Sequence, residues 1–204
     1  MENIVKEFVN GMEHLRNNLY FSYFAVAFIE QKPFNEDLEF PEPFGIVTAE
    51  QLNATTDQII DEYQNWIRRH FVIDMVLIYE KYATRMISTH KNNGIRIEPS
   101  LIPSTRQSNM FENMPYLFTE EDKKFITQLR RIKNCVVHYN GQYSKTNKID
   151  YTFDLQTFIS NGNEGKIILF HWNTLMWMYI KLLEVVQRVD TNYFKYYTGS
   201  SIND

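Results

Sequence analysis

The chain has 204 residues, of which 44% are hydrophobic and 23% charged, and its formal net charge is −4. This length and composition predict one globular domain and exclude a largely disordered chain. The negative charge excludes a surface that is basic all over, as in proteins that bind nucleic acid with their whole surface, but it permits a local basic strip. We expect the domain to span residues 1–197 and residues 198–204 to form a disordered tail.

The number of cysteines and the hydropathy of the sequence indicate the cellular compartment in which the protein is expected. Cys135 is the only cysteine, which excludes an intramolecular disulfide and a cysteine-based zinc site and fits a reducing cytosol. The sequence shows no charged leader followed by an apolar run, and no stretch of about 18 apolar residues. A cytoplasmic location without membrane contact is therefore expected.

The first half of the chain has helical patterning. Over residues 2–31 apolar side chains recur at spacings of three to five, which predicts a helix, and Pro33 ends it. Residues 33–46 contain three prolines and four acids and are predicted to be a connecting loop. Thr48 and Gln51 have the spacing of a capping box. They predict a second helix to about residue 90, long enough that we expect a kink or break.

The second half is less regular. Residues 95–118 contain Pro99, Pro103 and Pro115 and are predicted to be a long loop. Thr119 caps a third helix with three acids in its first turn. Residues 150–158 and 166–170 are predicted to be strands around a turn, and residues 172–193 a further helix. The predicted fold is all-α: a bundle of four to five helices with a small β-hairpin insertion before the last helix.

The third predicted helix ends in the sequence RRIKNCVVHYNG, residues 130–141. At about 100° per residue, one side of this helix is apolar and is expected to face the core. It carries Phe125, Leu129, Ile132 and Val136, with Cys135 at its boundary. The opposite side is a polar stripe at spacings of three and four, formed by Lys124, Thr127, Arg131, Asn134 and His138.

An arginine and a histidine on one stripe suit RNA cleavage without a metal. An imidazole can take or give a proton near neutral pH, and a guanidinium can bind a phosphate bidentately and stabilise transition-state charge. Asn134 would orient the imidazole. A structural alternative stays open, because basic residues at a helix end interact well with its dipole, Gly141 can cap the helix, and polar stripes are normal on bundle helices.

The residues Arg131 to His138, with six residues between them on a helix of a bundle, resemble the HEPN superfamily. The string R-I-K-N-C-V-V-H-Y-N-G is similar to a HEPN subgroup that ends in Arg-Asn, three residues, His, a polar residue and Gly. The resemblance implies a metal-independent endoribonuclease in a toxin–antitoxin or phage-defence role. It also implies a homodimer in which two such helices meet, with RNA and an antitoxin or defence protein as partners.

The subgroup places arginine where this chain has Lys133. Lys133 provides the positive charge, or Arg131 replaces it, or the chain is a catalytically inactive module that binds RNA or a protein. The catalytic residues implied are Arg131, Asn134 and His138. The RNA-binding residues expected around them are Arg130, Lys133, Lys124, Tyr139 and Asn140.

Other candidates have structural explanations. His70 follows Arg68 and Arg69, but its apolar neighbours predict a position at the edge of the core. Asp74, Tyr79 and Glu80 are expected to approach the third helix and form structural hydrogen bonds. His14, His90 and His171 have no partner residue at the spacing of metal ligands. Neither a metal nor another cofactor is therefore expected.

Overall fold

The computed structural model describes residues 2–31, 35–40, 45–92, 117–139 and 170–198. Its helices are α1 (Glu2–Gln31), α2 (Ala49–Asn92), α4 (Glu120–Tyr139) and α5 (Trp172–Thr198), and its strands are β1 (Leu38–Phe40) and β2 (Gly45–Val47). The predicted all-α bundle is therefore confirmed. The predicted hairpin before the last helix, the loop over residues 95–116, Asn140, Gly141 and residues 199–204 lie outside the described residues.

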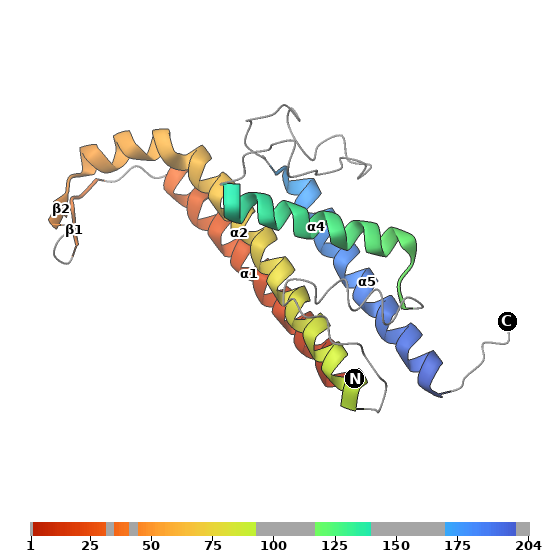
Figure 1. Ribbon diagram of the computed structural model, residues 1–204. Helices are drawn as coiled ribbons and strands as arrows, with labels where there is room; N and C mark the ends of the chain where they lie inside the picture. Colours follow the sequence, from red (N-terminus) through yellow and green to blue (C-terminus); the bar gives the residue numbers. More distant parts are fainter. Residues whose placement is uncertain (1, 32–34, 41–44, 93–116, 140–169, 199–204) are drawn as a thin grey trace.

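The helices α1 and α2 run antiparallel, side by side, along most of their length (Figure 1). α4 packs across α2, and α5 contacts both α1 and α2. α2 is continuous over 44 residues, so the expected break is absent, but the helix bends after its first turns, as the expected kink requires (Figure 1). Its first turns project beyond the bundle together with β1 and β2 (Figure 1).

A short hairpin stands where the sequence predicted only a loop. β1 pairs antiparallel with β2, Leu38 opposite Val47 and Phe40 opposite Gly45. Gly45 has a φ of 68°, in the left-handed region that glycine adopts without steric strain. The prediction of a loop here was wrong because strands of three residues are too short to show a period in the sequence.

Both predicted helix starts form capping boxes. The Thr48 backbone N–H donates to Gln51 Oε1 over 3.0 Å, and the Gln51 N–H donates to Thr48 Oγ1 over 3.2 Å. At α4 the Thr119 N–H donates to Asp122 Oδ2 over 3.0 Å, and the Asp122 N–H donates to Thr119 Oγ1 over 3.1 Å. These bonds satisfy backbone N–H groups that the first helical turn leaves unpaired.

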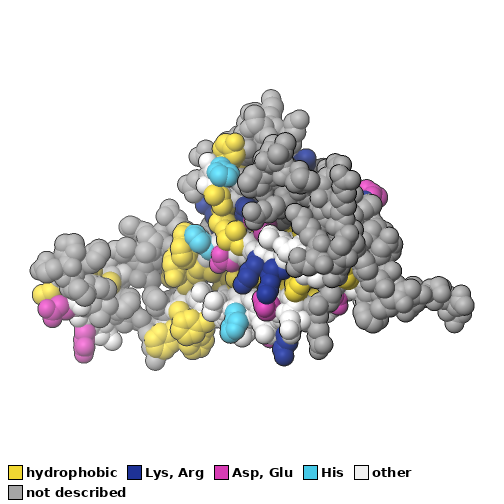
Figure 2. All heavy atoms as spheres, turned by 60° about the horizontal axis from the view of Figure 1, so that its bottom comes forward, with side chains coloured by type: hydrophobic (Ala, Val, Ile, Leu, Met, Phe, Trp, Pro, Cys, Tyr) yellow, Lys and Arg dark blue, Asp and Glu magenta, His cyan; other side chains and the backbone are white. Residues whose placement is uncertain are grey.

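The surface combines polar and apolar areas. Figure 2 shows a face on which hydrophobic side chains gather beside the projecting end of the molecule, while basic side chains lie nearer its centre. Exposed apolar side chains are normal when they are scattered, so their grouping is the informative feature.

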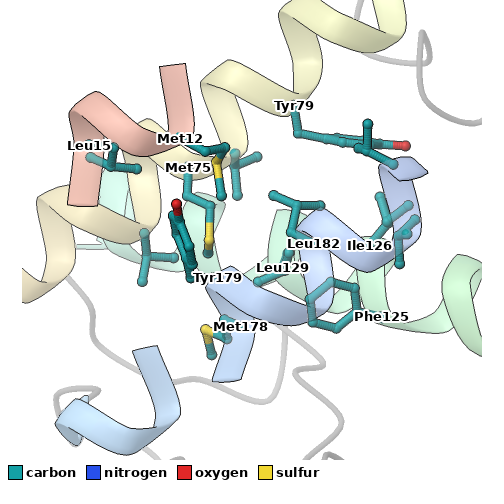
Figure 3. Close-up of a cluster of buried hydrophobic side chains, with 14 of the residues drawn as sticks. Met12, Leu15, Met75, Tyr79, Phe125, Ile126, Leu129, Met178, Tyr179 and Leu182 are labelled. Carbon is teal, nitrogen blue, oxygen red and sulfur yellow. The ribbon is translucent and has the colours of Figure 1, made fainter. Parts of the chain in front are cut away.

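All four helices among the described residues contribute to one core (Figure 3). α1 provides Met12 and Leu15, α2 provides Met75 and Tyr79, α4 provides Phe125, Ile126 and Leu129, and α5 provides Met178, Tyr179 and Leu182. Every one of these side chains is buried. The core therefore fixes how α4 is oriented in the bundle, because its apolar side must face the other helices.

Candidate functional site on helix α4

The two sides of α4 have different environments. Phe125, Leu129, Ile132 and Val136 are buried, which confirms the predicted core side, and Cys135 is also buried. On the polar stripe, Lys124 and His138 are exposed, whereas Thr127, Arg131 and Asn134 are half-buried. The stripe therefore lies along a part of α4 that solvent, and so a dissolved ligand, can reach.

The stripe is exposed at both of its ends, at Lys124 and at His138. The rings of His138 and Tyr139 lie edge to face with centroids 6.5 Å apart, and both side chains are exposed. Arg130 is half-buried at the margin of the stripe. Because the Cα–Cβ bonds of a helix tilt toward its N-terminus, the His138 side chain starts in the direction of Asn134.

Lys133 lies off the stripe and points to α2. Its ammonium forms an ion pair with Glu80 at 3.0 Å, and only 17% of the Lys133 side chain is exposed. The predicted approach of Glu80 to the third helix is thus confirmed. The ion pair links α4 to α2. Lys133 stands at the position where the HEPN subgroup has arginine, and its positive charge is paired with Glu80.

α4 is fixed at its start by a second ion pair, which sequence reasoning missed. The Asp122 side chain is fully buried and accepts hydrogen bonds from Arg188 Nη2 over 2.7 Å and Nε over 3.1 Å. Burial by itself raises the pKa of Asp122, but the hydrogen bonds from Arg188 and Thr119 outweigh burial and bring the pKa below its usual value. The sequence indicated only an acid in the first turn, since Arg188 is 66 residues away.

His70 and its neighbour Arg68 have structural roles. The His70 Nδ1 lies 2.9 Å from the Trp66 carbonyl oxygen, and the two rings are 3.9 Å apart. Arg68 donates to the Tyr23 hydroxyl and, over 3.0 Å, to the Phe170 carbonyl oxygen. Arg68 therefore joins α1, α2 and the residues just before α5, which the sequence did not indicate.

Within the described ranges, no group of three or more His, Cys, Asp or Glu side chains is placed to hold a metal ion. Among the same residues, no helix combines the length and hydrophobicity needed to cross a membrane. His14 is exposed on α1, and His171 is exposed in the residue just before α5.

No protein-family model matches the chain, and neither a curated protein nor a solved structure matches it. The likeness to the HEPN superfamily therefore rests on the end of α4 and on the helical architecture.

Proposed function

We propose that this chain is a metal-independent endoribonuclease of the HEPN type, with its site on the polar stripe of α4. His138 transfers the proton, Arg131 binds the scissile phosphate and Asn134 orients the imidazole. The observation that carries the proposal is the division of α4: these three residues share its accessible side, while the core side is buried.

The geometry of a helix allows the three residues to act on one phosphate. Asn134 lies one turn before His138 and Arg131 two turns before it, so their Cα atoms span about 10 Å along the axis. The Lys133 ammonium is bound to Glu80. Arg131 is then the basic residue of the stripe closest in sequence to His138, and its planar guanidinium suits a phosphate better than an ammonium does.

Ribose-directed cleavage needs one group to accept a proton and another to give one. One stripe offers a single histidine, so the second proton transfer needs water, another residue or a second copy of the chain. The biological role that fits such an enzyme is a toxin or a phage-defence effector under the control of a partner protein.

The test is cleavage of varied RNAs in EDTA by the wild type, His138→Ala and Arg131→Ala. We expect the wild type to cleave and both variants to lose at least 100-fold in rate, the usual size of a general-acid or charge-stabilisation effect. His14→Ala is the matched control, because His14 is also an exposed histidine on a helix. Equal losses in His14→Ala and His138→Ala would contradict the assignment, and growth arrest on expression is the companion measurement.

The Lys133–Glu80 ion pair favours a second candidate, a catalytically inactive module of the same architecture that binds RNA or a protein. If Lys133 stabilises the contact between α4 and α2 and does not act on a phosphate, the chain can bind RNA without cleaving it. This candidate predicts no cleavage by the wild type and RNA binding that weakens in Arg131→Ala. Cleavage that appears only in Lys133→Arg would show that the substitution at this position removed the activity.

A further inference from the structure

An aromatic surface on α1 has no role in the site on α4. It consists of Tyr20, Phe21, Phe24 and Phe28, which we call the α1 aromatic face. Phe21 is 73% exposed and Phe24 69%, and Tyr20 and Phe28 are each about half exposed. On the helix these residues lie opposite the side that carries Met12, Leu15 and Leu19 into the core.

The α1 aromatic face is ordered by its own contacts. The rings of Phe24 and Phe28 stack with centroids 6.4 Å apart, and Tyr20 lies 5.9 Å from the Trp172 ring at the start of α5. Two further aromatic residues, Tyr63 and Trp66, are about half exposed on α2, and their stacked rings have centroids 5.7 Å apart. They lie at the same end of the α1–α2 pair as the α1 aromatic face, because Arg68, close to them on α2, donates a hydrogen bond to Tyr23 on α1.

The exposed area is larger than scattered apolar residues explain. Since an aromatic side chain offers about 150–250 Å², the α1 aromatic face exposes about 500 Å², and Tyr63 and Trp66 add about 200 Å². The largest apolar patch of a typical monomer is about 300–600 Å², and each partner in a stable complex buries about 800 Å². The exposed aromatic area thus approaches what one protomer contributes to a dimer.

The charge pattern identifies the kind of partner. Between Arg16 and Glu30 the sequence of α1 has no charged residue. Nucleic acid and anionic membranes both require Lys or Arg beside the contact surface. An uncharged surface can instead meet its own copy without repulsion, although each chain carries a net charge of −4.

We propose that the α1 aromatic face is a homodimer interface occupied by the same face of a second copy. Tyr20, Phe24 and Phe28 are one turn apart, so two α1 helices cross antiparallel about a two-fold axis near Phe24. Phe28 of each copy then packs against Tyr20 and Phe21 of the other. This interface does not rest on the proposed ribonuclease function, because it joins two copies whatever α4 binds.

The test is the mass of the purified chain by light scattering and sedimentation equilibrium over micromolar concentrations. We expect a dimer, and Phe24→Glu is expected to raise its dissociation constant at least about 100-fold, since both copies lose a central aromatic. Ile180→Glu is the matched control, because Ile180 is 54% exposed on α5. Circular dichroism checks that the helical content is unchanged in both variants.

Crosslinking adds a positive result. Phe24→Cys is expected to give a disulfide-linked dimer on oxidation, whereas Ile180→Cys is not, and Cys135 is buried and stays unreactive. A monomeric wild type, a dimer unaffected by Phe24→Glu, or a dimer lost in Ile180→Glu would each overturn the proposal. So would a monomer that binds phosphatidylcholine vesicles through Phe24, which would make a lipid surface the occupant.

Discussion

Replacing Asp122 with alanine is expected to lower the free energy of unfolding by about 3 kcal/mol. The carboxylate accepts two hydrogen bonds from Arg188 and one from the Thr119 backbone N–H, and it is fully buried. Loss of a helix cap removes about 1 kcal/mol and loss of charge-assisted hydrogen bonds about 2 kcal/mol. This loss of unfolding free energy is at the lower end of the range for breaking a buried ion pair. The reason is that the Arg188 side chain is 39% exposed, so water can hydrate its charge once Asp122 is removed.

Urea unfolding followed by circular dichroism measures this change, with Glu121→Ala as the control. Glu121 lies in the same first turn and pairs with Lys181 at 2.6 Å, but it is largely exposed, so its removal is expected to change stability by less than about 1 kcal/mol. If Asp122→Ala loses no more than Glu121→Ala, the buried ion pair does not stabilise α4 and the reasoning is refuted.

The same ion pair gives a pH dependence. The pKa of Asp122 is lower in the folded protein than the usual value of about 4 in an unfolded chain. The stabilisation is therefore complete above about pH 4 and is lost as the pH falls through the lower folded-state pKa. As the pH falls through this range, the free energy of unfolding of Asp122→Asn, measured in urea at each pH, is expected to decrease less than that of the wild type. Equal decreases in the two proteins would show that Asp122 contributes nothing to the acid sensitivity.

Three further substitutions and one change of pH test the packing of the bundle. Ile132→Ala is expected to lower the free energy of unfolding by about 3 kcal/mol in denaturant, because Ile132 is fully buried; a loss below 1 kcal/mol would place it outside the core. Glu80→Gln should lower it by no more than about 1 kcal/mol, since the Lys133–Glu80 pair is partly exposed, and a larger loss would show a stronger link between α2 and α4. Burial raises the pKa of Tyr79 and Tyr82 above the usual value of about 10, so stability is expected to fall as the pH rises beyond about 10. The Tyr79 hydroxyl is buried and has no hydrogen-bond partner among the described residues, so Tyr79→Phe should be neutral or stabilising by about 1 kcal/mol, and a clear destabilisation would reveal a bond to that hydroxyl.

The sequence alone determined the helices and their buried sides. Periodicity located α1 over Glu2–Gln31, and two local signals marked the starts of α2 and α4: the Thr48–Gln51 pair, and Thr119 followed by three acids. It also separated the core side of α4 from the polar stripe. These features are local, because helix periodicity and capping depend on residues three or four positions apart.

Only the tertiary structure decided which residues meet between elements. Lys133 pairs with Glu80, 53 residues away, and Asp122 with Arg188, 66 residues away. Neither ion pair has a sequence signature, because both depend on how α4 lies against α2 and α5. Exposure of the α1 aromatic face was equally hidden, since aromatic residues at helical spacing are expected in the core. The sequence thus provided the candidate residues on α4, and the packing of the helices determined which of their charges already bind within the fold.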